Sequence, residues 1–227
     1  MTTAQTAMIR KTPVAYAQQA LKPKMGELNG MEVALEFEGA SVENARKQLL
    51  GVTDVSCFQR FSVKGPQAAA WLAGKGMNTP AAINSWDEAA PGTMILRLGG
   101  SEFLLEDQHS GDTCALLAKG FKQAEVAGVY KVQRADAAFI LSGSEALDLL
   151  SELCMLDLRD SALGANAVVM TQVAGISATL LRQTLNGQQV YRIWCDETYG
   201  PYLWDMLTEV AKELGGGAVG LSCHFKK

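Results

Sequence analysis

Two similar segments follow one another in this chain, and this duplication restricts the folds that it can adopt. The first copy begins at residue 51 as GVTDVS and continues at residues 61–68 as FSVKGPQA. The second begins at residue 128 as GVYKVQ and continues at residues 139–146 as FILSGSEA. Each copy predicts two strands, a tight glycine turn and a short helix. One repetition is too few for a solenoid, so the pattern indicates a duplicated α+β module.

The first copy predicts strands at residues 52–55 and 58–63, followed by a helix that contains Trp71 and Leu72. Residues 77–92 hold two prolines and predict a loop, and a hairpin over 94–106 and a helix over 113–122 follow. Before the first strand, Ser41 is expected to cap a short helix that carries Val42, Ala45 and Leu49 on one face.

The second copy predicts the same order with one added strand. Strands are expected at residues 129–133, 138–141, 168–172, 177–184 and 188–195, with a turn at Asn186-Gly187. Ser144 opens a helix whose leucines face inward. Leu203, Leu207, Val210 and Leu214 share one face of a last helix, which a run of three glycines ends.

The sequence therefore predicts an α+β fold of two ferredoxin-like modules, each a mostly antiparallel sheet with helices on one side. We expect an irregular N-terminal arm at 1–40, a first module at 41–126, a second module at 127–214 and a flexible tail at 215–227. The hairpin at Asn186-Gly187 and the helix over 202–214 are where the copies differ most, so we expect a partner-specific surface there.

The charge content argues against nucleic acid and favours a protein interface. The net charge is −4, which leaves no basic footprint for nucleic acid. Charged residues make up 19 %, below the roughly 25 % of an ordinary soluble domain. A thinly charged surface favours a large contact with other proteins, although a small domain with few charges has the same composition.

The cysteines and the apolar segments predict a cytoplasmic protein. An odd number of cysteines, all far apart, favours reduced and mostly buried thiols: Cys57, Cys114, Cys154, Cys195 and Cys223. Residues 1–21 contain no apolar core with a cleavage site, so no signal peptide is expected. No apolar stretch approaches the length of a membrane span.

Most signatures of catalysis are absent from the sequence. Neither His109 nor His224 has the spacing of a metal site, and there is no phosphate-binding loop or nucleophile elbow. We expect both histidines at a surface or interface. Residues 215–220 match GxGxxG, but the motif follows a helix instead of a strand, so it does not predict a dinucleotide site.

Several carboxylates and arginines could still act in a site. Five acids could assist proton transfer in a pocket that shifts their pKa: Asp54, Glu102, Asp136, Asp157 and Asp160. Asp157 and Asp160 are better explained by a turn in which Arg159 pairs locally. Arg60, Arg134 and Arg182 could grip a carboxylate, but we expect ordinary surface arginines on strand edges.

The repeated segments resemble the folate-binding aminomethyltransferase superfamily, whose members share a duplicated fold. RLGGSEFLL at 97–105 is similar to the LGP-x-EWLL segment of the gamma subunit of heterotetrameric sarcosine oxidase. LSG at 141–143 with Cys154 and LDL at 156–158, TQVA at 171–174 and YLW at 202–204 are similar to segments of the same family. The likeness covers roughly residues 50–214 in order.

This resemblance implies a non-catalytic structural subunit in a complex with alpha, beta and delta subunits. Such a complex oxidises sarcosine or another N-methylated amino acid and passes the one-carbon unit to tetrahydrofolate. The resemblance places FAD, FMN, NAD and tetrahydrofolate mainly in the alpha and beta subunits, and zinc in the delta subunit. It implies no cofactor bound by this chain.

The sequence also departs from its relatives. CDET at 195–198 replaces the arginine and serine expected before YLW, and MILRL at 94–98 lacks the acid that aminomethyltransferases carry there. The KGCYxGQE motif of an iron–sulfur branch is missing. We therefore expect no catalytic, cofactor-binding or metal-binding residue. A stand-alone folate-binding one-carbon transferase and an unrelated scaffold on the same fold stay open.

Overall fold

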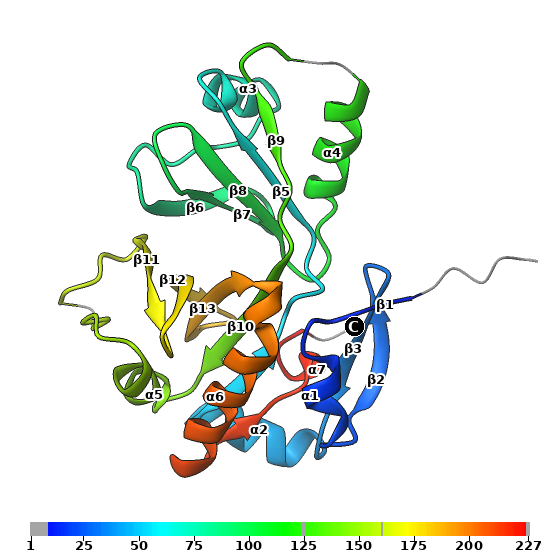
Figure 1. Cartoon of the computed structure of the whole chain (residues 1–227), viewed down its shortest axis with the longest axis vertical. Helices are drawn as coiled ribbons and strands as arrows, with labels where there is room; N and C mark the ends of the chain where they lie inside the picture. The colour runs from blue at the N-terminus through cyan, green and yellow to red at the C-terminus, as the bar shows by residue number, and fades with distance from the viewer. Residues whose placement is uncertain (1–8, 124–125, 160, 226–227) are drawn as a thin grey trace, which may run out of the picture.

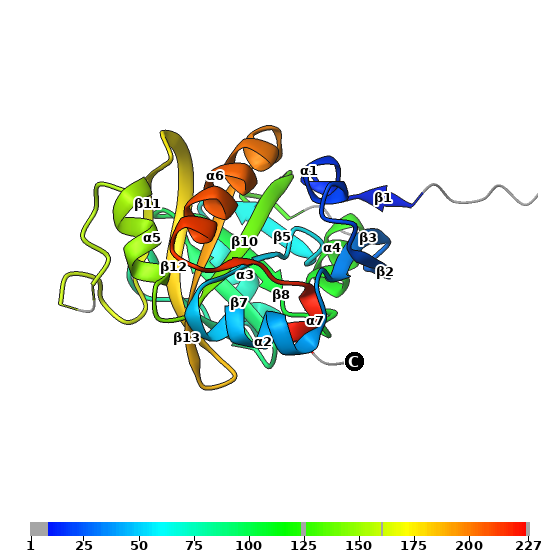
Figure 2. The same cartoon turned by 90° about the horizontal axis from the view of Figure 1, so that it is seen from below.

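A computed structural model of the chain describes residues 9–123, 126–159 and 161–225. Two large sheets pack against each other through one face, and helices cover their opposite faces (Figure 1, Figure 2). A small third sheet lies beside them. Its order is β1-β3-β2, with β1 at Arg10–Lys11, β3 at Met31–Glu36 and β2 at Lys24–Leu28.

The larger sheet has the order β11-β12-β13-β10-β4-β14. Its strands are β11 (Val168–Val173), β12 (Ile176–Leu185), β13 (Gln188–Asp196), β10 (Asp136–Ser142), β4 (Gly51–Asp54) and β14 (Gly217–Ala218). All neighbours in it are antiparallel except β14 and β4. The second sheet, β6-β7-β8-β5-β9, is antiparallel throughout. It comprises β6 (Ser85–Ala90), β7 (Thr93–Arg97), β8 (Glu102–Asp107), β5 (Arg60–Lys64) and β9 (Tyr130–Val132).

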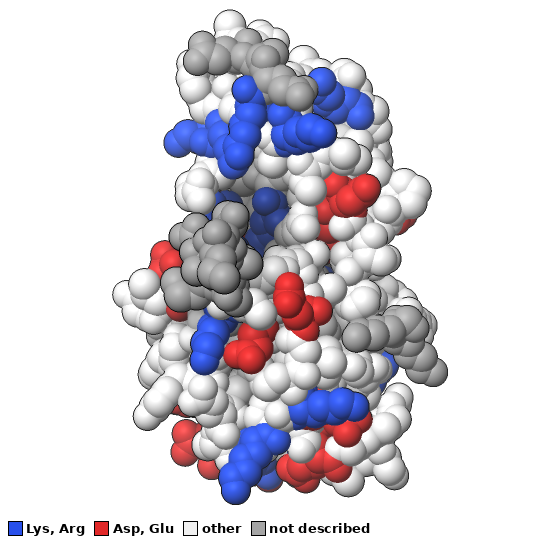
Figure 3. Space-filling view, turned by 90° about the vertical axis from the view of Figure 1, so that its right-hand side faces the viewer, with Lys and Arg blue, Asp and Glu red and all other residues white. Residues whose placement is uncertain are grey.

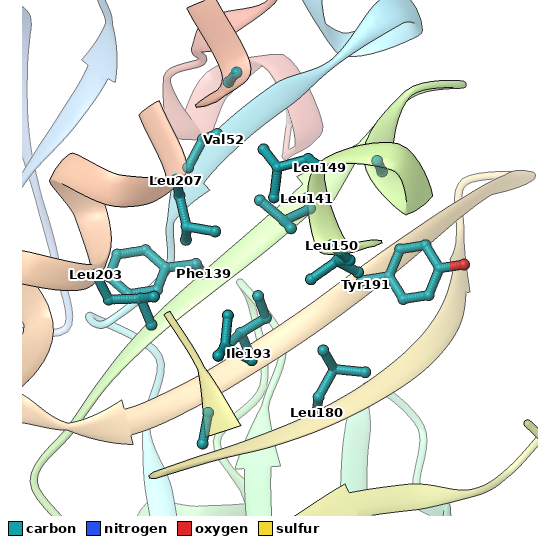
Figure 4. Close-up of a cluster of buried hydrophobic side chains, with 14 of the residues drawn as sticks. Val52, Phe139, Leu141, Leu149, Leu150, Leu180, Tyr191, Ile193, Leu203 and Leu207 are labelled. Carbon is teal, nitrogen blue, oxygen red and sulfur yellow. The ribbon is translucent and has the colours of Figure 1, made fainter. Parts of the chain in front are cut away.

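The helices are α1 (Ala15–Gln19), α2 (Ala40–Leu49), α3 (Ala68–Gly74), α4 (Thr113–Gln123), α5 (Ala146–Leu153), α6 (Gly200–Glu213) and α7 (Leu221–His224), with a 3₁₀ turn at Glu197–Tyr199. Most of the helices pack on the sheets, and α1 packs on α6. The expected stripe on α6 is confirmed for Leu203, Leu207 and Val210, which are buried. Leu203 and Leu207 pack with Phe139 of the larger sheet and Leu150 of α5 (Figure 4).

The two large sheets repeat one strand order. The order β6-β7-β8-β5-β9 in one sheet corresponds, strand by strand, to the order β11-β12-β13-β10-β4 in the other. The expected duplicated, mostly antiparallel α+β fold is therefore confirmed. The strand predicted as an addition to the second half has a counterpart in β6, so the loop expected at 77–92 is wrong in part. Trp86 N–H bonds to the Asn166 carbonyl at 2.9 Å, a pairing with a distant segment that local sequence does not reveal.

The two halves exchange their first strands. β4 belongs to the first copy of the repeat but pairs with β10 of the second, and β9 belongs to the second copy but pairs with β5 of the first. Sequence order alone suggests that each module keeps its own strands. The expected boundaries of the four segments remain predictions. The exchange of strands is seen directly in the backbone pairing.

The two repeated glycine turns anchor this exchange. Gly65 has a φ of +125° and Gly143 a φ of +106°, conformations that favour glycine. A Cβ on Gly65 would lie 2.3 Å from the Gly128 carbonyl, and a Cβ on Gly143 would lie 2.3 Å from the Leu49 carbonyl. Each turn therefore packs against the backbone at the start of the other copy.

Two segments that were expected to be irregular are ordered. Within the arm predicted at 1–40, residues 9–40 include three paired strands, while residues 1–8 lie outside the described chain. In the tail predicted to be flexible, β14 pairs with β4, and Val219 N–H bonds to the Val52 carbonyl at 2.9 Å. The β1–β3 and β14–β4 pairings join residues far apart in sequence, and glycine and proline content alone does not predict them. Strands β2 and β3, in contrast, form a local hairpin over Asn29-Gly30.

Helix α2 is present, but the predicted cap and packing face are wrong. Gly39 is the N-cap, and Val42 and Leu49 are exposed. The helix instead buries Glu43, whose carboxylate accepts hydrogen bonds from Glu38 N–H at 3.0 Å and Gly220 N–H at 2.8 Å. These backbone groups need a partner once they are buried, and this requirement decides which face turns inward.

Candidate functional site

A polar cavity of about 310 Å³ lies where the three sheets approach one another. Its walls come from β1, the turn before β5, the start of α4 and the segment before β10. Basic residues line it from three directions: Arg10, Lys11, Arg60 and Arg134. On the face that carries α4 and β1, Figure 3 shows Lys and Arg side chains inside a hollow. We call this space the central cavity.

An ion pair separates the central cavity from a larger groove. The Arg134 guanidinium donates to the Asp136 carboxylate in two hydrogen bonds of 3.0 Å. Both residues line the central cavity and also the groove, whose volume is about 720 Å³. Asp136 is therefore neutralised locally, and Arg134 is a cavity residue instead of the ordinary edge arginine that we expected.

A second charged cluster is buried between the large sheets, beside the central cavity. Glu106 accepts hydrogen bonds from Arg60 at 2.5 Å, from Arg192 and from the Trp194 indole N–H at 2.7 Å. Burial on its own raises the pKa of Glu106, but Arg60 and Arg192 outweigh it and hold this pKa below its ordinary value. Glu106 is thus a fully paired carboxylate and is poorly suited to proton transfer.

Arg60 differs from the surface arginine that we expected. Its side chain is 7 % exposed, and it donates both to Glu106 and to the carbonyls of Val55 and Asp136. One of the three candidate arginines thus bridges the two sheets from inside. Arg182 of β12 is half-buried and lines neither of these spaces.

Asp54 is buried at the end of β4 and holds the N-terminal segment in place. It accepts hydrogen bonds of 2.5 Å from Thr12 Oγ1 and of 2.5 Å and 2.9 Å from Ser56 Oγ and N–H. Burial raises the pKa of Asp54, and the bonds to Ser56 and Thr12 oppose this rise. Asp54 does not line the central cavity, so its shifted pKa reflects packing.

The other predicted acids lie away from the cavity. Asp157 pairs with Arg159 at 2.6 Å in an exposed turn, which confirms the local pairing expected there. Hydrogen bonds from the Arg159 side chain and backbone lower the pKa of Asp157 to about 2. Glu102 faces Lys64 across β8 and β5. Asp160 lies outside the described residues.

The two thiols that line the central cavity are buried and not activated. All five cysteines are free and four are buried, as predicted. Cys57 and Cys114 line the central cavity, but burial raises the pKa of both thiols far above the neutral range. The cavity therefore contains no activated sulfur nucleophile.

The described residues form neither a metal-ion site nor a membrane-spanning helix. Among them, no three His, Cys, Asp or Glu side chains come together as a metal-ion site. Within the same ranges, no helix has the length and apolar character needed to cross a bilayer. The GxGxxG match at 215–220 joins α6 to β14, as expected for a segment that follows a helix.

Sequence reasoning missed Glu106, Arg192 and Trp194. Glu106 follows three apolar residues in FLLE, and Arg192 and Trp194 alternate with apolar residues in VYRIW. A charged residue that continues the buried face of a strand signals a buried pair, but the partner can be found only in three dimensions. Together, the cavity offers basic groups, the paired Asp136, the exposed Glu197 and buried thiols, an arrangement better suited to binding than to acid–base catalysis.

Comparisons with known proteins agree on one kind of fold. The family model described as the GCVT N-terminal domain matches residues 89–225. An aminomethyltransferase of Thermus thermophilus is 28 % identical over 92 % of this chain, which spans 64 % of that protein's length. The sarcosine oxidase subunit gamma of Corynebacterium sp. U-96 is 27 % identical over 66 % of this chain and 72 % of that protein.

Solved structures show the same architecture. The aminomethyltransferase T of the Bartonella henselae glycine cleavage system superposes with a TM-score of 0.78 at 17 % identity, covering 96 % of this chain and 61 % of that chain. A chain of heterotetrameric sarcosine oxidase from Corynebacterium sp. U-96 superposes with a TM-score of 0.65 at 21 % identity, covering 93 % of this chain and 100 % of that one.

Proposed function

Because the chain belongs to the GCVT N-terminal domain family, we propose that it is a gamma-like structural subunit of a multi-subunit oxidase or dehydrogenase for sarcosine or a related N-methylated amino acid. Its role is to support oxidative demethylation linked to tetrahydrofolate one-carbon metabolism. Alpha, beta and delta subunits hold the FAD, FMN, NAD, tetrahydrofolate and zinc in this proposal. The complex is cytoplasmic.

The observation that carries the proposal is how much of each similar protein's length this chain covers. The superposed chain of the heterotetrameric sarcosine oxidase is covered completely, whereas the aminomethyltransferases are covered over 61 % and 64 % of their lengths. The state of the charged groups supports the same conclusion. Glu106 and Asp136 are both paired with arginine, and Asp54 is packed away from the cavity, so none of these three carboxylates is poised for one-carbon chemistry. Glu197, the other acid in the lining, is exposed.

The groove offers a surface on which a partner subunit could lie. Three apolar side chains at its rim are exposed, and Met155 is completely so, with Leu156 and Met170 beside it in the groove lining. Exposed apolar groups that gather around a concave surface are typical of a protein interface. We assign this rim to a partner subunit of the complex.

The hairpin and the helix where we expected a partner-specific surface have shorter counterparts in the first half. The β12–β13 hairpin corresponds to β7–β8 in the first half, and α6 corresponds to α4. The proposed interface therefore rests on the groove rim and not on these two elements.

Co-purification and activity together test the proposal. The tagged chain should bring down flavoprotein partners from its native host, and removing it should dissociate the complex or abolish sarcosine oxidation. Met155→Asp with Met170→Asp should weaken this association, whereas Leu116→Asp, an equally apolar exposed site on α4, should not. Turnover of sarcosine with tetrahydrofolate, or tight flavin binding, by the chain alone would contradict the proposal.

A second candidate is a stand-alone folate-binding one-carbon transferase, and the basic central cavity favours it. Arg10 and Lys11 present positive charge to any carboxylate-bearing molecule there, while Arg134 is already paired with Asp136. Calorimetry with a reduced folate separates the two functions. Micromolar affinity, about −8 kcal/mol, in the isolated chain would favour the transferase, and no measurable heat would favour the structural subunit.

A further inference from the structure

A separate cavity of about 500 Å³ brings together both histidines of the chain. His109 follows β8, and His224 ends α7. Lys47 enters the cavity from α2, and Asn186 enters from the tip of the β12–β13 hairpin. Four segments far apart in sequence therefore build this space, which we call the Lys47 cavity.

The walls of the Lys47 cavity are ordered by specific contacts. The His109 ring stacks on Phe225 with centroids 5.6 Å apart and planes at 3°, and Phe225 packs edge-on against Phe58 at 5.2 Å. The Asn186 side-chain amide donates to the His224 carbonyl at 3.0 Å. Aromatic stacking on one side and a hydrogen bond on the other fix its shape before anything binds.

Lys47 brings a positive charge into the cavity, and Glu43, one turn earlier on α2, accepts hydrogen bonds from backbone N–H groups instead of pairing with it. No Asp or Glu lines it, and Lys47 makes no ion pair with any described residue. The Lys47 ammonium donates to the Cys223 carbonyl at 3.1 Å, which leaves further N–H groups of its three free to donate. A cation in such a place attracts an anion from solution.

The positive charge of Lys47 also affects His224. It is 4 % exposed, and its Nε2 has no hydrogen-bond partner. Burial, followed by the charges of Lys47 and Arg192, lowers the pKa of His224 to about 3. The imidazole is therefore neutral, and the positive charge around it comes from Lys47 and Arg192.

We propose that the Lys47 cavity binds a small organic oxyanion, whose carboxylate or phosphate group lies against the Lys47 ammonium. The Ser110 hydroxyl and the Gln108 amide line the same space and supply neutral donors. The volume lies within the range of small-molecule sites, so it accommodates a molecule larger than a bare ion. This site is distinct from the central cavity and does not depend on the proposed function.

Histidine NMR tests the proposal, because the only two imidazoles of the chain both lie in the cavity. The full chain labelled with ¹⁵N is titrated with inorganic phosphate and, separately, with acetate, against sodium chloride at matched ionic strength. We expect saturable shifts of the His109 and His224 ring signals. Saturation by phosphate alone indicates that the ligand is a phosphate ester, and saturation by acetate alone indicates a carboxylate. Saturation by both indicates that the cavity recognises either oxyanion.

Variants separate binding at Lys47 from general salt effects. Lys47→Met should weaken the affinity at least about tenfold, and Lys47→Arg should retain it because the positive charge stays. Lys119→Met, an exposed lysine of α4 outside the cavity, should behave like wild type. Shifts that match those in chloride, or that persist unchanged in a folded Lys47→Met protein, would overturn the proposal.

Discussion

The Trp194 indole donates a hydrogen bond of 2.7 Å to Glu106, and these two residues hold matching positions in the two halves. Glu106 lies opposite Arg60 across β8 and β5, and Trp194 lies opposite Ala138 across β13 and β10. Arg60 and Ala138 each directly precede the phenylalanine that aligns the two copies. The halves therefore meet at equivalent positions, which the two copies fill with different side chains.

Glu106→Gln should destabilise the fold by about 3–5 kcal/mol, because it removes the buried charge that pairs Arg60 and Arg192. Urea unfolding followed by tryptophan fluorescence measures the change. Glu209→Gln on the exposed face of α6 is the matched control and should change stability by less than about 0.5 kcal/mol. Equal effects of the two substitutions would show that the Glu106 cluster does not support the fold.

Asp54→Asn should be tolerated within about 1 kcal/mol at neutral pH, since it removes a buried carboxyl that burial disfavours in its charged form. The remaining oxygen of the amide can still accept from Ser56. Asp54→Ala should cost about 1–3 kcal/mol because Thr12 and Ser56 lose their acceptor. Thermal unfolding of both variants checks the order, and a more damaging Asn than Ala would refute it.

The stability of the chain should fall between pH 6.5 and about pH 3 through His224. Its folded pKa of about 3 lies below the unfolded value of about 6.5, so the folded state favours the neutral ring. This contribution is complete above the unfolded pKa and is lost as the pH falls towards the folded one. The difference in unfolding free energy between wild type and His224→Gln should shrink across this window, and a constant difference would contradict the assignment.

Gly143→Ala should lower stability by more than about 1 kcal/mol, because φ is +106° and the new Cβ would meet the Leu49 carbonyl at 2.3 Å. Gly74→Ala is the matched control. It lies in α3 with no atom within 4 Å of the new Cβ, so it should stabilise the fold by about 0.5–1 kcal/mol. Calorimetric melting of the two variants should therefore show shifts of opposite sign.

The elements that the sequence predicted well are those with strong local patterns. The Asn186-Gly187 turn is present, with positive φ at both residues, and the apolar face of α6 is buried as its spacing indicates. The resemblance to the aminomethyltransferase superfamily also rested on ordered motifs, and the family match confirms it. Such patterns can be recognised in the sequence because a turn or a helical face is determined by residues close together in the chain.

What the sequence could not predict depends on contacts between distant residues. β6 is a strand because it pairs with β7 and meets the segment before β11, although two prolines nearby favour a loop. The central cavity combines side chains from β1, α4 and the segment before β10. Arg60 was read as an edge arginine because its partner, Glu106, lies 46 residues away.

The exchange of β4 and β9 makes each half incomplete when it is alone. A cut between α4 and β9 produces two fragments. In the first fragment β5 becomes an open sheet edge because β9 is missing, and in the second β10 becomes an open edge because β4 is missing. Each exposed edge has the register of the strand that the other fragment carries. Two separately produced fragments should therefore reassemble by mutual strand addition, so this architecture provides the geometry of a split protein whose pieces recognise only their own complement.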